Sequence, residues 1–557
     1  MSGAHERDTS RARKARGAFF TPEPVAEHLT CWAIRDRTDV VVEPSCGEAA
    51  FLLPAARRLA ALGTDLRRPG ADQLRGYELH PASAEAARAL LREEGLAAEI
   101  QTGDFFDVTP EGSASAVVGN PPFVRFHGWA GAARDRAQEA ARRAGVRLTS
   151  LASSWAAFTV HAAQFLRPDG RLALVLPAEL LTVNYAADVR DFLLRRFARI
   201  RIVTFSKRVF PDIQEEVVLL LAEGSGPADR LEIRQLASAR DLDDVDSGIT
   251  TTWRPENSRD RWSPALVAPA ARDLYEALTR PGDGFAPLLT WGETTLGMVT
   301  GANGFFALSP REAQAHGLDD EDTLPVCPPG SRHLRGLSYT AGMARRLGTE
   351  GSATVLFRPR EEPSHAARVL IARGESEGVH HAYKCRVRRP WWRVPLVPPA
   401  DLLLTCMNAD SPRLTTNSAG AHHLNSVHGV YLAPDHREIG RRLLPLASLT
   451  SVTLLGAEIV GRAYGGGMLK IEPGEADRWP VPSPELVDKA HDDLVGARRR
   501  VRDLLARGHL TAASAVVDRI LLVDVLGLDP RDVAEFVSAR GALVERRRAR
   551  ARSGTAR

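Results

Sequence analysis

The stretch SAVVGNPPFVRF, from Ser115 to Phe126, places a Gly-Asn-Pro-Pro-Phe turn directly after an apolar strand. Prolines fix their own φ and lack an N–H group, so the carbonyl groups around them can accept hydrogen bonds from another molecule. Asn120 can accept through its amide oxygen, Pro121 through its carbonyl, and Phe123 can stack on a ring. This set fits a planar base with an exocyclic amine, and a plain Asn-Pro turn is the alternative.

Around this turn, short β-branched runs alternate with amphipathic helical stretches from Val40 to about Glu223, a pattern typical of a doubly wound α/β sheet. The expected strands are VVVEPS (40–45), LRGYEL (74–79), AEIQTGDFF (98–106), SAVVGNPPF (115–123), GRLALVLPAEL (170–180), RIRIVTF (199–205) and EVVLLLAEG (216–224). The expected helices between them are FLLPAARRLAAL (51–62), PASAEAARALLREEG (81–95), SSWAAFTVHAAQFLRP (153–168) and NYAADVRDFLLRRF (184–197).

The last two expected strands are joined by only SKRVFPDIQE, which is too short for a helical crossover. The seventh strand should therefore run antiparallel to its neighbour. Seven strands with an antiparallel last one, and helices on both faces, is the arrangement of the Rossmann-like methyltransferases.

Length and composition indicate a globular protein of several domains. The chain has 557 residues and a formal net charge of only +4, and it uses Arg far more than Lys. Arg suits phosphates and guanine edges, although a GC-rich genome would give the same bias. The five cysteines are scattered without zinc spacing, and no stretch is long and apolar enough to span a membrane. We therefore expect no disulfide, metal or membrane contact, and a cytoplasmic protein.

Four regions are expected along the chain. Residues 1–224 form the catalytic domain, and residues 225–286, which contain a Gly-Ser-Gly-Pro signal and an acidic loop, form a connecting segment. Residues 287–483, rich in Gly, Pro, Trp and Arg, form an irregular domain with β structure, mixed with helix. Residues 484–557 are helical and end in a basic tail, VERRRARARSGTAR, that we expect to be disordered.

Acidic residues follow the expected strands at the carboxyl edge of the sheet, where open α/β sheets bind ligands. The turn EPSCG, from Glu43 to Gly47, has one glycine and so does not predict a pyrophosphate cradle. Glu78 ends the next strand, where a carboxylate can accept both hydroxyls of a ribose. Asp104 in GDFF can accept from an adenine amino group, and solvated acids at strand ends are the alternative for both.

In this order, GAFFTP (17–22), EPSCG, YELH, GDFF and GNPPF resemble the gamma class of N6-adenine DNA methyltransferases, the modification methylases of bacterial restriction systems. The resemblance covers Arg16 to about Glu223. It implies an S-adenosylmethionine-dependent enzyme that methylates N6 of a flipped adenine at a specific site in double-stranded DNA.

The resemblance also implies roles for individual residues. The methionine end of the cofactor would lie against Phe19, Thr21, Pro22, Glu43, Pro44 and Cys46. Glu78 would bind its ribose, and Asp104 and Phe105 its adenine. Asn120 and Pro121 would accept from the target N6, and Phe123 would stack on the flipped base.

The segment FSKRVFPDIQEEV resembles the family segment whose aromatic residue covers the other face of the base. It points to Phe210, with Phe205 as the competing choice.

The C-terminal half contains phrases similar to target-recognition regions, RRPWWRVP among them. The residues expected to contact DNA are Arg386, Arg388, Arg389, Trp392 and Arg393. The tryptophans can equally fill a β core. The cluster His422, His423, Asn425 and His428 has no acidic ligands beside it, so we expect a hydrogen-bonded loop there and no metal.

Three rival interpretations differ in substrate or in class. Similar turns occur in methylases of release-factor glutamine and of rRNA guanine N2, but the GAFFTP segment and the Arg-rich C-terminal half favour duplex DNA. A catalytically dead specificity subunit would not need Glu78, Asp104 and Asn120 together. A fused nuclease is not expected, since PDIQEEV lacks the required lysine. We expect a monomer whose cognate restriction endonuclease, where there is one, is a separate chain.

Overall fold

The computed structural model describes residues 21–67, 72–125, 128–207, 209–210, 216–242 and 249–552. These residues form two compact units, one that ends at Ala268 and one from Pro269 to Arg547. Phe19 lies outside the described residues.

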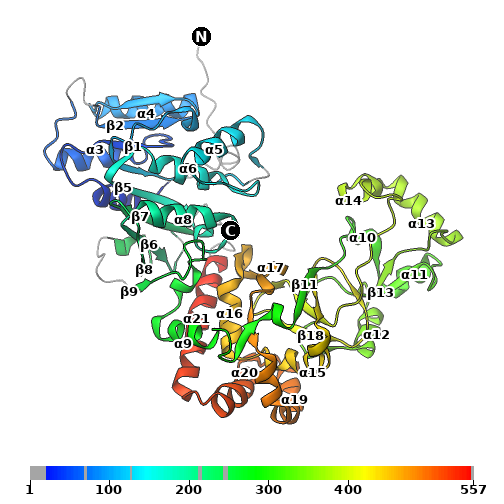
Figure 1. Ribbon diagram of the computed structural model, residues 1–557. Coiled ribbons are helices and arrows are strands. Elements are labelled where there is room, and N and C mark those ends of the chain that lie inside the picture. The colour runs from blue at the N-terminus through cyan, green and yellow to red at the C-terminus, as the bar shows by residue number, and fades with distance from the viewer. Residues whose placement is uncertain are drawn as a thin grey trace. The chain divides into compact units, whose positions relative to one another are not determined.

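The first unit is built on one sheet with the strand order β3-β2-β1-β4-β5-β7-β6-β8-β9 (Figure 1). The strands are β1 (Val41–Glu43), β2 (Leu74–Glu78), β3 (Glu99–Thr102), β4 (Ala114–Gly119), β5 (Leu166–Pro177), β6 (Arg199–Phe205), β7 (Val217–Glu223), β8 (Leu231–Leu236) and β9 (Ile249–Trp253). The first five are parallel, and β7 lies antiparallel between β5 and β6, as the short connection predicted.

Helices connect the parallel strands. They are α2 (Glu23–Ala33), α3 (Leu52–Ala61), α4 (Pro81–Glu93), α5 (Ala132–Arg143), α6 (Ser154–Ala163), α7 (Glu179–Thr182) and α8 (Ala187–Arg196), with short 3-10 turns η1 (Phe105–Asp107) and η3 (Asn184–Ala186). The chain leaves β1 toward β2 on one side and β4 toward β5 on the other, so right-handed crossovers place the connecting helices on opposite faces of the sheet. The predicted fold class is thus confirmed.

The sheet has two more strands than the seven we expected. The segment 225–286, predicted to be a connecting segment, contains β8, which pairs parallel to β6, and β9, which pairs antiparallel to β8. In its strand LEIRQL, four of the six residues are buried and two are partly exposed, so β8 extends the sheet beyond β6 and β9 forms the edge. The Gly-Ser-Gly-Pro signal therefore marks a turn within the first unit.

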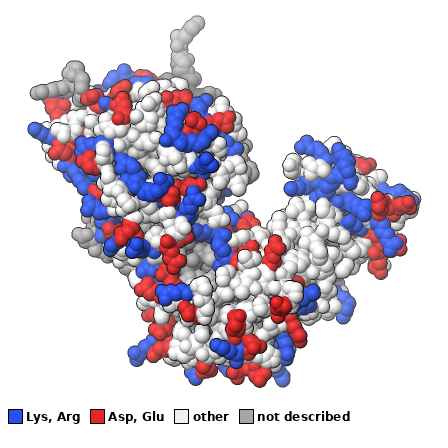
Figure 2. All heavy atoms as spheres, viewed as in Figure 1, with Lys and Arg blue, Asp and Glu red and all other residues white. Residues whose placement is uncertain are grey.

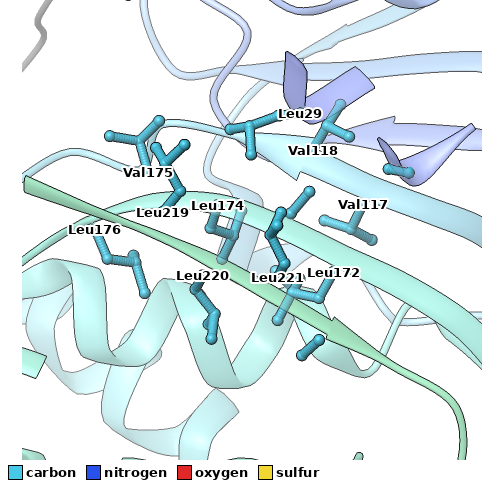
Figure 3. Close-up of a cluster of buried hydrophobic side chains, with 14 of the residues drawn as sticks. Leu29, Val117, Val118, Leu172, Leu174, Val175, Leu176, Leu219, Leu220 and Leu221 are labelled. Carbon is cyan, nitrogen blue, oxygen red and sulfur yellow. The ribbon is translucent and has the colours of Figure 1, made fainter. Parts of the chain in front are cut away.

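The core of the first unit lies around its central strands. Strand β4, the part of β5 from Leu172 to Pro177 and the part of β7 from Val217 to Ala222 are mostly apolar and buried, as central strands covered by helices on both faces of a sheet must be. Figure 3 shows Val117 and Val118 of β4 beside the leucines of β5 and β7, with Leu29 of α2 against them. This packing holds the carboxyl ends of the strands in place.

The second unit contains four smaller sheets. Their strand orders are β10-β23, β11-β20-β16-β18-β14, β12-β15-β13-β19 and β17-β22-β21. The strands are β10 (Phe285–Pro287), β11 (Gly292–Leu296), β12 (Ala307–Leu308), β13 (Thr323–Cys327), β14 (Ser338–Tyr339), β15 (Val355–Phe357), β16 (Leu402–Thr405), β17 (Met407–Asn408), β18 (Leu414–Asn417), β19 (His422–His423), β20 (Val427–Leu432), β21 (Arg462–Tyr464), β22 (Met468–Lys470) and β23 (Pro480–Pro482).

Helices precede, separate and follow these strands along the chain. They are α9 (Pro269–Leu278), α10 (Asn303–Phe306), α11 (Pro310–Ala315), α12 (Ala341–Thr349), α13 (His365–Ser376), α14 (Tyr383–Arg386), α15 (Arg437–Ala447), α16 (Ser451–Val460), α17 (Pro473–Ala476), α18 (Pro484–Lys489), α19 (His491–Ala506), α20 (Leu510–Asp518), the π-helical turn η10 (Arg519–Val525) and α21 (Pro530–Arg552). Residues 287–483 and 484–547, which we expected to be separate regions, belong to one unit.

The basic tail is described only as far as Arg552, and this part is helical, which differs from the expectation of disorder; residues 553–557 lie outside the described residues. Helix α21 continues to Arg552, and Arg547 is 3% exposed. Its guanidinium forms an ion pair with Glu458 of α16 at 2.8 Å and also donates to the carbonyl of Gly467. A buried partner explains why this arginine is ordered, which a run of basic residues in the sequence could not indicate.

Among the described residues, no single helix is long and apolar enough to cross a membrane. One pair, Pro434–Ala447 with Ser451–Val460, passes by length and composition when joined, but it is bent by 89°. Most apolar residues of both helices are buried within the second unit.

A buried carboxyl in α20 predicts a pH-dependent stability. Burial raises the pKa of Asp518 from 3.8 to about 7, although the Ser451 N–H donates to its Oδ1 at 2.7 Å. Between these pH values the unfolded chain has released this proton and the folded chain still holds it, so the free energy of unfolding should fall as pH rises from about 4 to about 7. Asp518→Asn should remove this fall and stabilise the chain at pH 8 by a few kcal/mol, on the order set by such a shift.

Urea unfolding at pH 5 and pH 8 checks this prediction. Asp524→Asn, which changes a half-exposed carboxyl in the next helical turn, serves as the control and should leave the pH dependence unchanged. Equal stabilities of Asp518→Asn and the wild type at pH 8 would contradict it.

Candidate active site

The predicted site residues of the first unit gather at the carboxyl ends of four neighbouring strands. The EPSCG turn follows β1, Glu78 ends β2, Asp104 follows β3 and Asn120 follows β4. Because β1 to β4 are parallel neighbours, their carboxyl ends meet at one edge of the sheet. The sheet therefore brings together the four segments that the sequence analysis singled out.

Glu43 and Cys46 are buried side chains of the EPSCG turn after β1. Glu43 is 1% exposed, and its Oε2 accepts from the N–H groups of Phe51 at 3.3 Å and Leu52 at 2.9 Å, at the start of α3. Burial raises the pKa of the Glu43 carboxyl well above its usual range, and the charge of Glu78 adds to the shift. The Cys46 thiol is fully buried, and burial raises its pKa. Both side chains shape the turn from within the core.

Glu78 joins the turn to the end of β2. Its Oε2 accepts from the Gly47 N–H at 2.9 Å, and its Oε1 accepts from the His80 N–H at 2.8 Å. Gly47 has a φ of +53°, a left-handed conformation that suits glycine. Each carboxylate oxygen retains a second acceptor site, so Glu78 can also accept from a ligand at this edge.

Asp104 is held by a residue that the sequence analysis did not single out. Its Oδ2 accepts from Nε and Nη2 of Arg136 in α5, at 3.0 and 2.8 Å, and its Oδ1 accepts from the Phe106 N–H at 3.1 Å. The Asp104 side chain is 14% exposed. The arginine-rich composition of α5 is the only sequence signal for this contact.

Phe105 lies in an aromatic cluster rather than at the surface. Its ring is 3% exposed and packs with those of Tyr77, Phe158, His161 and Phe165, at centroid distances of 4.8 to 5.8 Å. Any contribution to cofactor binding would therefore come from this packed position behind Asp104.

The Asn-Pro-Pro-Phe turn contacts two other predicted segments. The Asn120 Nδ2 donates to the Thr21 Oγ1 at 3.2 Å, and the Ser45 Oγ donates to the Asn120 carbonyl at 3.3 Å. Pro22, adjacent to Thr21, precedes α2 as its N-cap residue. Asn120 thus links the chain before α2, the turn after β1 and the turn after β4.

The predicted aromatic residues are mostly buried. Phe123 is 8% exposed, Phe205 in β6 is 4% exposed and Phe210 in the following loop is 2% exposed. Pro44 and Pro121 are also buried. The choice between Phe205 and Phe210 as the second stacking residue stays open.

Two of the predicted DNA contacts in the second unit are structural. The Arg388 Nη2 donates to the carbonyls of Val299 at 2.6 Å and Thr300 at 2.5 Å, and burial lowers its pKa. Trp392 is 8% exposed and belongs to the hydrophobic cluster around Phe357. Both side chains are therefore held by contacts within the second unit.

The remaining predicted contacts are accessible. Arg386 and Arg389 are exposed at the end of α14, and Arg393 lies 3.7 Å from Glu361. Lys384 is exposed beside them, and the Tyr383 ring between Lys384 and Arg386 is 65% exposed. Figure 2 shows Lys and Arg side chains gathered on the surface over α13 and α14.

The histidine cluster is part of the β structure. His422 Nδ1 and His428 Nε2 contact the carbonyls of Val397 at 2.8 Å and Ile471 at 2.9 Å, and His423 is fully buried. Within the described ranges, no group of three or more His, Cys, Asp or Glu side chains is arranged to hold a metal ion.

The strand order, the antiparallel β7 and the polar groups at the carboxyl ends of β1 to β4 define a Rossmann-like methyltransferase fold. Residues 6–228 match the model of the N-6 DNA methylase family. Residues 259–522 match the model of the C-terminal domain of the type II methyltransferase M.Eco57I.

Relatives align with nearly the whole chain. The type II methyltransferase M.XamI of Xanthomonas campestris pv. amaranthicola is 27% identical, over 85% of this chain and 86% of its own length. M.AccI of Acinetobacter calcoaceticus is 22% identical, over 89% and 91%. The solved type IIL restriction-modification enzyme MmeI has a similar fold, with a TM-score of 0.57 and 13% identity, over 94% of this chain and 75% of its own.

The two family models and the type II relatives together support an N6-adenine DNA methyltransferase of the restriction-modification type. The chain is an adenine-specific DNA methyltransferase, and the methylase class that its N-terminal part matches is S-adenosylmethionine-dependent.

Proposed function

We propose that this enzyme binds S-adenosylmethionine at the carboxyl edge of β1 to β4 and methylates N6 of an adenine that it flips out of duplex DNA. The observation that carries the proposal is the position of Asn120, which is hydrogen-bonded to both Thr21 and Ser45. These bonds join Asn120, the proposed amine acceptor, to the two segments predicted to hold the methionine end of the cofactor, and this supports the proposal.

The residues at this edge fit the cofactor. Glu78 would accept from the ribose hydroxyls, and Asp104 from the adenine amino group, because each retains acceptor capacity beyond its present bonds. Phe19, Thr21, Pro22, Glu43, Pro44, Cys46 and Phe105 would shape the rest of the site, the buried ones from within the core. When bound, S-adenosylmethionine would supply a methyl group on a positively charged sulfonium.

The catalytic turn would prepare the target nitrogen. The N6 lone pair of adenine is delocalised into the ring, and the amine is paired inside the helix, so the base must leave the stack. The Asn120 amide oxygen and the Pro121 carbonyl would accept the two N6 protons, which directs the lone pair toward the methyl group. Phe123, with Phe210 or Phe205, would stack on the base and offset about 1–3 kcal/mol of the flipping cost.

The second unit would select the DNA sequence. The exposed Lys384, Arg386 and Arg389 on and after α14 suit phosphate groups, and Arg393 lies nearby. We further propose that the enzyme acts as a cytoplasmic monomer, with a restriction endonuclease as a separate chain.

Base flipping is tested with a fluorescent base. Long-read mapping of methylated adenines in DNA from an expressing host first identifies the recognition site. A duplex with 2-aminopurine in place of the target adenine should then become fluorescent when the enzyme binds, while 2-aminopurine at another adenine of the site should not. Equal responses at both positions would contradict flipping of a single base.

Asp104→Ala tests the cofactor assignment. Loss of one partly buried acceptor should weaken S-adenosylmethionine binding by about 1–3 kcal/mol. Isothermal calorimetry measures this, with Asp107→Ala as the control, because Asp107 is the exposed carboxyl near the same arginine. Unchanged affinity in both Asp104→Ala and Glu78→Ala would exclude the proposed cofactor site.

A further inference from the structure

The loop that follows Asn120 is attached to the first residue of α6 by three hydrogen bonds. The Ser154 Oγ donates to the carbonyl of Pro122 and accepts from the Val124 N–H at 2.9 Å. The Ser154 N–H donates to the Val124 carbonyl at 3.0 Å. One residue therefore satisfies three backbone groups of the Pro-Phe-Val segment.

The chemistry of serine explains this contact. A hydroxyl group donates one hydrogen bond and accepts others from the same atom, so Oγ can join a carbonyl to an N–H. Ser154 is 2% exposed, and its own N–H is one of the first N–H groups of a helix, which have no partner within the helix. The loop thus caps α6 while α6 holds the loop.

These bonds fix the two groups on either side of Pro122. Pro121 precedes it and Phe123 follows it, so holding the Pro122 carbonyl and the Val124 N–H limits the rotation of the peptide units between them. The Pro122 carbonyl already accepts from Ser154, and the Pro121 carbonyl is the proposed acceptor for the amine. We infer that Ser154 is a positioning residue that aims Pro121 and Phe123 at the target base, an inference that rests on the proposed function.

A second group of bonds holds the residues on both sides of Ser154. The Tyr185 hydroxyl lies 3.1 Å from the Ser153 Oγ and accepts from the Trp155 Nε1 at 3.2 Å. It also contacts the Glu179 carboxylate, two residues after β5 ends. Burial and the Glu179 charge raise the pKa of Tyr185, so its hydroxyl stays protonated. The start of α6 is therefore tied to the end of β5, which neighbours β4.

Ser154→Ala tests the inference in the full-length enzyme. The measurements are kcat and KM for transfer of labelled methyl groups to unmethylated genomic DNA, and the stoichiometry and affinity of S-adenosylmethionine binding by calorimetry. We expect kcat to fall about 10²-fold, because a misplacement of the reacting groups by about 1 Å reduces the rate by about this factor. Cofactor stoichiometry and affinity should stay unchanged.

Thr159→Val is the matched control on the same helix. Thr159 is fully buried, and its Oγ1 donates to the Trp155 carbonyl at 2.8 Å, away from the turn. It should lower the unfolding midpoint but leave kcat per cofactor-binding site near that of the wild type. If Ser154→Ala and Thr159→Val have the same kcat, the inference is wrong.

Two further variants separate the possible failures. If Asn120→Ala remains active, the proposed function itself fails; if it is inactive while Ser154→Ala behaves like Thr159→Val, only the positioning role fails. Tyr185→Phe removes one hydroxyl from the outer group of bonds and should lower kcat by a smaller factor, about three- to tenfold. If Tyr185→Phe has the kcat of the wild type, Tyr185 does not contribute to positioning Ser154.

Discussion

Asn120→Ala should reduce methyl transfer by at least about 10²–10³-fold, the loss typical of removing one group that stabilises a transition state. The side chain would accept one of the two N6 protons, and alanine has no acceptor. Methyl transfer to DNA is measured with labelled S-adenosylmethionine, and the product is identified by nucleoside mass spectrometry.

Cofactor binding should be nearly intact in this variant. Asn120 donates to Thr21, so some loss of order in the segment before α2 is expected, but Glu78 and Asp104 are unchanged. Ser45→Ala is the control, because it removes only the bond to the Asn120 carbonyl. An Asn120→Ala enzyme that methylates adenine at more than a tenth of the wild-type rate would exclude the proposed role of this residue.

Replacing Lys384, Arg386 and Arg389 together with glutamine should weaken DNA binding about 10²–10³-fold near 0.1 M salt, because each phosphate contact contributes through counterion release. The slope of log K against log salt should become shallower by about 2 to 3 for three lost contacts. Fluorescence anisotropy of a labelled duplex, titrated at salt concentrations from about 50 to about 300 mM, measures both the affinity for DNA and its dependence on salt.

The control changes the same number of charges elsewhere in the second unit. Lys489, Arg499 and Arg500 are exposed on α18 and α19, and their joint replacement with glutamine should leave the salt slope unchanged. Arg388→Gln provides a contrast, since its bonds to Val299 and Thr300 make it a stability residue. An unchanged slope in the α14 variant would contradict the assignment of this surface to DNA.

Much of the first unit could be predicted because its signals are local. Each of the seven expected strands is present, and Glu78, Asp104 and Asn120 lie at or just after strand ends, as their sequence positions indicated. Parallel strands bring such positions to one edge of a sheet whatever the details of packing. Strands β8 and β9 were missed because they follow a Gly-Ser-Gly-Pro turn and carry polar residues between the apolar ones, and such short strands resemble a connecting segment in sequence.

In the second unit, burial separates side chains that the sequence analysis grouped together as DNA contacts. The sequence alone gives no reason to assign different roles to Arg386, Arg388 and Arg389. In the structure, Arg388 donates to backbone carbonyls, whereas Arg386 and Arg389 are exposed. Trp392 is buried although it lies in the same arginine-rich segment of the sequence. Arginine can serve either role, so composition alone could not separate them.

The sequence by itself determined the fold class, the order of the chemical groups along the sheet edge and the family to which they point, since these depend on strand periodicity and short motifs. Only the tertiary structure decided which groups meet. Thr21 contacts Asn120 across 99 residues, and both Arg136 with Asp104 and Ser154 with Pro122 meet across 32. Such contacts depend on how a helix or loop packs against a strand end, and no local pattern of residues encodes that packing.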